Sequence, residues 1–240
     1  MKGSARPPAF PEGSVSRLPL PRGEAGTRLR VRGDGPSGKG DGGSGQNIYS
    51  TMANDRPLFL PVILGTPRQG RASERVAAFV RDEVAKRPGV ETELIDIRTL
   101  ALPIDDAGES IKDPAFSAAV HRADGLILVV PEYNHGYPGL LKHALDTNLS
   151  EYVHKAVGIC GVSAGGFGGT RVIQNLLPVM RELGLVTIFW DGNFSGAQRL
   201  FDASGNLLDA AYIARIDKFL KELIWMAKVL RYGRENVSLG

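Results

Sequence analysis

Short apolar runs alternate with amphipathic stretches from Pro57 onward, and this alternation constrains the fold more than any other feature of the chain. Apolar, β-branched runs of about four to eight residues are typical of buried strands, whereas apolar residues spaced three or four apart are typical of helices. Strands that alternate with helices form a parallel sheet covered by helices on both faces. We therefore predict an α/β, doubly wound fold.

The pattern predicts strands over 58–65, 91–97, 125–131, 156–163 and 185–190. It predicts helices over 72–87, 138–145, 170–183 and 208–231, the last with Ile213, Ile216, Leu220, Leu223 and Ile224 facing the core. A parallel sheet of five strands fits the flavodoxin-like order 2-1-3-4-5, which binds its ligand outside the carboxyl ends of the strands. The turns that leave the strands at that edge are therefore the candidates for a site.

The first 51 residues differ in composition from the rest. They hold eleven Gly, six Pro, eight Lys or Arg and four Asp or Glu, a net charge of +4, so residues 52–240 carry −1 of the chain's total of +3. Such a segment buries too little apolar surface to offset the entropy lost on ordering. We expect 1–51 to be a disordered leader and 52–240 to be a flavodoxin-like domain. A transit peptide and an over-extended start, with Met52 as the first residue, both stay open.

Charge, hydropathy and cysteine usage exclude several classes of partner. The balanced charge of 52–240 does not indicate nucleic-acid binding. No apolar run approaches the ~20 residues needed to span a bilayer, and the apolar core of a secretory signal is missing. Cys160 is the only cysteine, so no intrachain disulfide can form. We expect a cytoplasmic protein that does not bind membranes.

The turn "GTPRQGRAS" (65–73) has the composition of an anion site. It runs directly into a predicted helix, whose first N–H groups and dipole favour negative charge. Arg68 has a planar fork suited to phosphate, and Thr66 and Ser73 supply hydroxyl groups. The alternative is an ordinary turn in which Ser73 only caps the helix. The segment matches neither the P-loop nor the G-x-G-x-x-G pattern.

Two further turns at the same predicted edge are unusual. "PEYNHGYPG" (131–139) places tyrosines, an asparagine and glycines after a buried strand, and "SAGGFGG" (163–169) has small residues around Phe167. Glycine allows the backbone to approach a ligand closely, although either turn alone could be an ordinary loop. Together the three turns offer a phosphate-binding site beside a flat cavity lined with hydrogen-bond donors. Flavin mononucleotide (FMN) has the matching shape.

The segments "GTPRQGRAS", "PEYNHGYPGLLKHALD" and "SAGGFGGTR" resemble the three signature segments of the NADPH-dependent FMN reductase family. These flavodoxin-like proteins include quinone, azo-dye and chromate reductases, and the resemblance covers about residues 61–184. It implies a phosphate site made of Thr66, Arg68 and Ser73. It implies that the ring and ribityl chain are lined by Pro131, Glu132, Tyr133 and Asn134, and closed on the other side by Ser163, Gly165 and Gly166. The family often has a serine where this chain has Thr66, which keeps the hydroxyl group.

The function that follows is an NAD(P)H-dependent FMN oxidoreductase that passes electrons through bound FMN to quinones or similar flat or oxidised acceptors. Its chemistry belongs to the cofactor, so we nominate no catalytic acid or base. Tyr133, Tyr137 and Phe167 would form an aromatic wall for flat partners. A non-enzymatic flavodoxin-type electron carrier is the alternative, but Arg68, Arg71 and the nearly neutral domain differ from the acidic surface of flavodoxins. The choice between NADPH and NADH stays open.

The stretch "GVSAG" (161–165) also fits the G-x-S-x-G motif of a serine hydrolase, with Ser163 as the nucleophile. All four histidines precede Ser163, which does not fit the order Ser, acid, His of that fold. We predict instead that Ser163 donates a hydrogen bond to a ligand. The histidines lack a metal-site spacing, so we predict no metal. We expect Lys142 and Lys155 to be surface charges.

The predicted helix after the second turn has apolar residues on more than one side, namely Leu140, Leu141, Ala144 and Leu145. One side would cover the sheet and another would cover a partner subunit. The resembled family commonly forms dimers or dimers of dimers. We therefore expect a homodimer or homotetramer.

Overall fold

The centre of the fold is a parallel sheet with the strand order β4-β2-β5-β6-β7. The structure is a computed structural model that describes residues 56–104 and 108–240. The strands in this order are β4 (Leu94–Asp96), β2 (Val62–Leu64), β5 (Gly125–Pro131), β6 (Ala156–Val162) and β7 (Val186–Thr187), and a further strand, β8 (Gly192–Phe194), also pairs with β6. This is the predicted order 2-1-3-4-5. The predicted leader, 1–51, lies outside the described residues, so its disorder stays a prediction.

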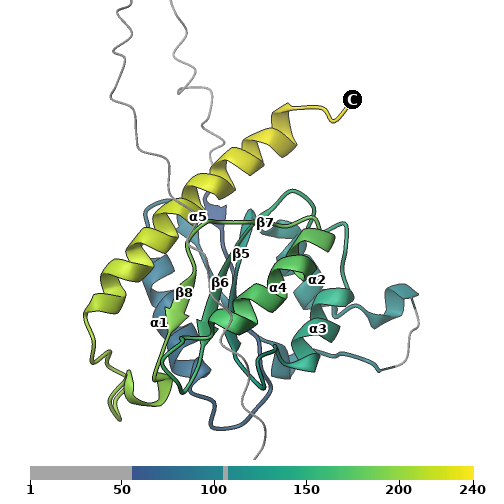
Figure 1. The fold of residues 1–240 in the computed structure, drawn as a ribbon. Coiled ribbons are helices and arrows are strands. Elements are labelled where there is room, and N and C mark those ends of the chain that lie inside the picture. Colours follow the sequence, from purple (N-terminus) through teal and green to yellow (C-terminus); the bar gives the residue numbers. More distant parts are fainter. Residues whose placement is uncertain (1–55, 105–107) are drawn as a thin grey trace, which may run out of the picture. The chain divides into compact units, whose positions relative to one another are not determined.

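Helices cover both faces of the sheet, which confirms the doubly wound architecture (Figure 1). One core cluster lies under α1 (Ser73–Ala85) and α5 (Ala211–Asn236), and the other lies under α2 (Pro114–Arg122), α3 (Gly139–Asp146) and α4 (Thr170–Glu182). Successive residues of β5 point alternately into the two clusters. That is why this strand is apolar throughout. The described residues also contain three single-turn helices: η2 (Ile97–Thr99), η3 (Gly108–Ile111) and η4 (Ala197–Arg199).

The first predicted strand, 58–65, is divided in two. β1 (Leu58–Phe59) pairs with β3 (Val90–Glu91), and β2 pairs with β4. Pro61 stands between β1 and β2 and has no N–H group to donate to a neighbouring strand. The predicted strand 91–97 is therefore divided at the matching place.

The fifth strand is not continuous over 185–190, so that prediction is wrong in detail. β7 pairs with the start of β6, and β8 (Gly192–Phe194) returns to the end of β6, at Cys160–Val162. Between them the N–H of Phe189 donates to the Glu222 carboxylate on α5 (3.0 Å) instead of to β6. The Phe189 side chain is consequently 78% exposed. A helix contact has replaced a strand contact.

The closing helix, α5, buries Ile216, Leu220 and Leu223 as predicted, and Ile224 packs against the same core. Ile213 was expected to face the core, but it is 48% exposed. Tyr212 takes the inward position in the first turn of α5 and stacks on Phe194, with ring centroids 5.1 Å apart.

Lys155 is buried, which corrects the expectation of a surface charge. Its Nζ donates to the backbone carbonyls of Val120 and His121, both at 2.7 Å, at the end of α2. Burial is the main cause that lowers the pKa of Lys155 to about 8. Lys155 therefore joins α2 to the start of β6. Lys142, in contrast, lies on the outer side of α3 and pairs with Asp146.

Candidate functional site

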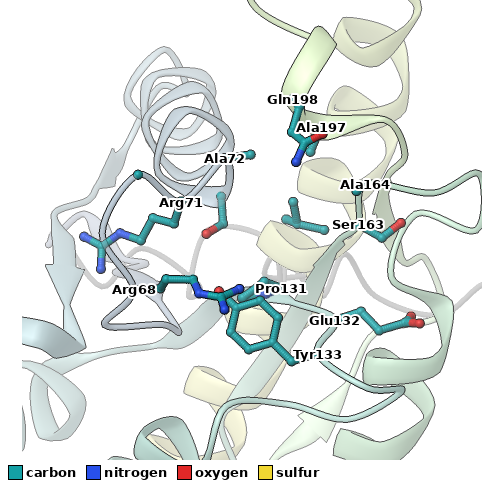
Figure 2. A pocket seen from close by; sticks show the side chains of 13 residues that line it. Arg68, Arg71, Ala72, Pro131, Glu132, Tyr133, Ser163, Ala164, Ala197 and Gln198 are labelled. Atoms are coloured by element: carbon teal, nitrogen blue, oxygen red, sulfur yellow. The ribbon is translucent and has the colours of Figure 1, made fainter.

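The three predicted turns meet at the carboxyl edge of β2, β5 and β6, where they line one cavity of about 280 Å³ (Figure 2). A fourth segment, η4, closes the cavity, and no motif in the sequence marked it. The lining residues are Arg68, Gly70, Arg71, Ala72, Ser73, Pro131, Glu132, Tyr133, Val162, Ser163, Ala164, Ala197 and Gln198. The adjacency follows from the parallel sheet, because the carboxyl ends of its strands share one edge.

The start of α1 gives one end of this cavity the character of an anion site. The residue before the helix is Ala72, whose side chain cannot accept hydrogen bonds from the first N–H groups of the helix. The hydroxyl oxygen of Ser73 is buried in the cavity lining, with no hydrogen-bond partner in the described part of the chain. Buried polar atoms normally have a partner. A bound phosphate would supply acceptors for both groups.

The two arginines of the first turn have different roles. The guanidinium of Arg68 lies over the ring of Tyr133, 4.9 Å from the ring centroid, and faces the cavity (Figure 2). The guanidinium of Arg71 points away from Tyr133 and bonds the carbonyl oxygen of Thr66 and the carboxylate of Asp96. Arg71 therefore shapes the turn, and Arg68 is the arginine that a ligand can reach.

Thr66 supports the cavity from behind instead of lining it. Its side chain is fully buried, and its Oγ1 lies 3.2 Å from the hydroxyl of Tyr133. The same Oγ1 accepts the backbone N–H of Arg68 at 3.4 Å. Thr66 thus couples the first turn to the second through Tyr133.

The second turn is a tight reversal with unusual backbone geometry. Tyr133 and Gly136 exchange both backbone hydrogen bonds, at 3.0 and 2.9 Å. Asn134 (φ 50°) and His135 (φ 67°) between them are left-handed, as the central residues of a type I′ turn must be. Asn tolerates this region. A left-handed histidine is less common, and strained backbone of this kind is often found at functional sites. The reversal directs Tyr133 toward the cavity, while Asn134 is exposed outside its lining.

Glu132 lines the cavity and also caps α4. The residue before α4 is Gly169, which has no side chain for this purpose. Instead, the Oε2 of Glu132 accepts the N–H of Arg171 at 3.2 Å, and its Oε1 lies 3.5 Å from the guanidinium of the same residue. Glu132 therefore joins the second turn to the helix that follows the third. The sequence contains no local signal for this contact.

Replacing Glu132 by Ala is expected to lower the free energy of unfolding by about 1 kcal/mol, because the N-terminus of α4 loses its acceptor. Glu132→Gln keeps an acceptor oxygen and is expected to lose less. Urea unfolding followed by circular dichroism measures both. Equal stability of Glu132→Ala and the unmodified chain would contradict the capping role.

The third turn packs closely against the sheet. The hydroxyl of Ser163 donates to the carbonyl of Gly165 at 3.0 Å, and its N–H donates to the carbonyl of Phe194 at 3.0 Å. None of the four histidines lines this cavity, so Ser163 has no histidine base there. At Gly169 (φ 76°) a Cβ atom would lie 2.5 Å from the nitrogen of Val162, so only glycine fits. Gly165 and Gly166 line an adjoining cavity instead.

The sheet order and the site at the carboxyl edge define a flavodoxin-like α/β protein. Residues 60–195, more than half of the chain, match the NADPH-dependent FMN reductase family. The chain belongs to this family.

Individual relatives agree with that assignment. An NADPH azoreductase of Bacillus sp. (strain OY1-2) is 34% identical over 124 residues, which are 50% of this chain and 66% of the azoreductase. An NAD(P)H-dependent FMN reductase of Pseudomonas aeruginosa is 32% identical over 151 residues, 59% of this chain and 82% of that protein. The solved structure of the flavoenzyme FerB, an NAD(P)H:(acceptor) oxidoreductase of Paracoccus denitrificans, has the same fold. Its TM-score is 0.60 at 20% identity, over 70% of this chain and 98% of FerB.

Proposed function

We propose that the cavity between the three turns binds FMN and that the chain is an NAD(P)H-dependent FMN oxidoreductase. The observation that carries the proposal is the buried, unpartnered hydroxyl of Ser73 beside the uncapped start of α1. In a chain of the NADPH-dependent FMN reductase family, this pair of features suits the phosphate of FMN.

Different residues at the cavity would hold different parts of the cofactor. Ser73, Arg68 and the first N–H groups of α1 would bind the phosphate, with Thr66 fixing the turn. Pro131, Glu132 and Tyr133 of the lining, together with the exposed Asn134 just outside it, would border the ring and the ribityl chain. The backbone N–H of Ala164, which lines this cavity, has no acceptor in the described part of the chain, so it can donate to the polar edge of a bound ring. Such donors stabilise negative charge on the ring. When bound, FMN supplies the hydride-accepting and electron-transfer chemistry.

The second substrate is proposed to be a small, flat electron acceptor, such as a quinone or an azo compound. Phe167 in the third turn is 69% exposed, and the guanidinium of Arg171 lies 4.9 Å from its ring centroid. Tyr133 lines the cavity, and Tyr137 packs at the edge of the core. The exposed ring of Phe167 and the half-buried ring of Tyr133 would favour planar partners over bulky ones.

Oxidation of NADPH or NADH by the purified, FMN-loaded protein with a soluble quinone tests this function. We expect catalytic turnover, a flavin absorption spectrum and bleaching of that spectrum by the donor under anaerobic conditions. A flavodoxin-type carrier would bind FMN but would not oxidise either donor without a separate reductase. Protein that takes up no FMN would contradict both functions.

We also propose that the chain self-associates, as a homodimer or homotetramer, and that it is cytoplasmic. On α3, Leu141, Ala144 and Leu145 pack into the chain's own core, and Leu140 is partly buried against it. α3 therefore leaves little apolar surface for a partner subunit. α5 instead exposes Trp225, Val229 and Tyr232.

The lone thiol, Cys160, is buried, which suits a reducing compartment. No helix in the described residues combines the length and apolarity needed to cross a membrane.

A further inference from the structure

A second cavity, of about 450 Å³, adjoins the proposed flavin cavity and shares Ala164 with it. Gly165 and Gly166 of the third turn form part of its lining, together with Ser195, Arg199 and Tyr212. A ligand that passes over the third turn from the flavin cavity would therefore enter this second cavity.

The wall between the two cavities is made of hydrogen-bonded backbone. The N–H of Gly196 donates to the carbonyl of Gly165 at 3.2 Å, and the N–H of Ala197 donates to the carbonyl of Ser163 at 3.1 Å. Gly196 is left-handed (φ 58°) and directly precedes η4. The second cavity is thus held in a fixed position relative to the third turn.

The polar groups of the second cavity favour an anion. The exposed side chain of Arg199 makes no hydrogen bond or ion pair with a described residue, and its Nη2 lies 3.8 Å from the position of a Cβ atom on Gly196. The hydroxyls of Ser195 and Tyr212 lie 3.2 Å apart. The guanidinium of Arg215 lies 4.8 Å from the ring centroid of Tyr212, which adds a second positive charge nearby.

One acidic residue, Asp209, also lines the cavity. Its Oδ1 accepts the N–H of Ala211 at the start of α5, at 3.0 Å. The lining therefore holds one arginine and one acid, and Arg215 lies nearby beside Tyr212. Asp209 bonds the start of α5, whereas the guanidinium of Arg199 is free to present the fork geometry that suits phosphate oxygens.

We propose that this cavity binds a phosphate group of the nicotinamide donor and that Arg199 is the residue that contacts it. The inference rests on the proposed function. A nicotinamide dinucleotide whose reactive end reaches the flavin cavity must place its phosphates on an adjoining surface. NADH offers the pyrophosphate, and NADPH offers an additional 2′-phosphate. The first turn is already assigned to the phosphate of FMN.

The test compares Arg199→Gln with Lys228→Gln, a control that also removes one positive charge. Lys228 is exposed on α5, about 24 Å along the helix from Tyr212. Calorimetry on the FMN-loaded proteins gives the Kd of adenosine 2′,5′-bisphosphate and of AMP, and steady-state kinetics gives the KM of NADPH and NADH. We expect Arg199→Gln to raise the Kd of the bisphosphate and the KM of NADPH about tenfold, as loss of one charged hydrogen bond should. The control should change neither.

Comparing the KM of NADPH with that of NADH, and the Kd of the bisphosphate with that of AMP, identifies which phosphate Arg199 contacts. If Arg199 binds the 2′-phosphate, the KM of NADH and the Kd of AMP stay unchanged; if it binds the pyrophosphate, both rise as well. Unchanged values for both donors and both nucleotides in Arg199→Gln would overturn the inference. Protein that binds the bisphosphate through Arg199 but oxidises neither donor would contradict the proposed function while supporting this cavity.

Discussion

Replacing Ser73 by Asp is expected to give a folded, colourless protein that binds FMN about a thousandfold more weakly than the unmodified chain. Ser73 is the first residue of α1 and lines the cavity with a hydroxyl that lacks a partner. Two like charges about 4 Å apart repel by about 4 kcal/mol at an effective dielectric constant of about 20, and that energy is close to a thousandfold in Kd. Asp at the start of a helix interacts favourably with the helix dipole, so the fold should persist.

Flavin fluorescence titration of the apo-proteins measures this effect, with Ser73→Ala and riboflavin as the two controls. Ser73→Ala removes one hydrogen bond and should weaken FMN binding about tenfold. Riboflavin has no phosphate, so Ser73→Asp should leave its affinity nearly unchanged. If riboflavin lost as much affinity as FMN, or if FMN bound Ser73→Asp normally, the phosphate would not lie at α1.

Replacing Asp124 by Asn is expected to lower the free energy of unfolding by about 3 kcal/mol without loss of FMN binding. Asp124 is fully buried before β5, at the edge of the sheet opposite the flavin cavity. Its carboxylate pairs with Arg56 at 2.8 Å, Arg234 at 3.3 Å and Arg231 at 3.4 Å, and it accepts the N–H of Phe59 at 3.1 Å. Removing one partner of a buried ion pair typically costs about 3–5 kcal/mol, because the opposite charges stay buried. The partial exposure of Arg56 places the value at the lower end.

Urea denaturation at neutral pH tests this expectation, and the midpoint should fall while the slope stays constant. Asp146→Asn is the matched control. Asp146 is exposed and pairs with Lys142 on the same helix, and such pairs contribute less than about 0.5 kcal/mol. A loss below 1 kcal/mol in Asp124→Asn would show that the arginines find other partners.

The sheet order and the meeting of the three turns could be predicted because both depend on strand periodicity and parallel topology. The break in the fifth strand could not. Phe189 and Trp190 are apolar like the residues of a strand, but Glu222, 33 residues further along the chain, takes the N–H that β6 would have bonded. A contact between distant segments has overridden a local preference.

In the candidate site, too, some residues could be predicted from the local sequence and others could not. Arg68 and Ser73 follow from the physics of a turn that enters a helix, and they line the cavity. The capping role of Glu132 and the presence of Gln198 in the lining depend on where α4 and η4 lie in space. Nothing in their local sequence specifies that position, so these roles required the structure.

A crystal structure of the protein with FMN would show whether the three turns bind this cofactor. We expect one FMN per chain, with its phosphate at the start of α1 beside Ser73 and Arg68, and its ring between Tyr133 and the turn that begins at Ser163. Electron density for FMN at any other place, or a saturated crystal with none in this cavity, would contradict this expectation.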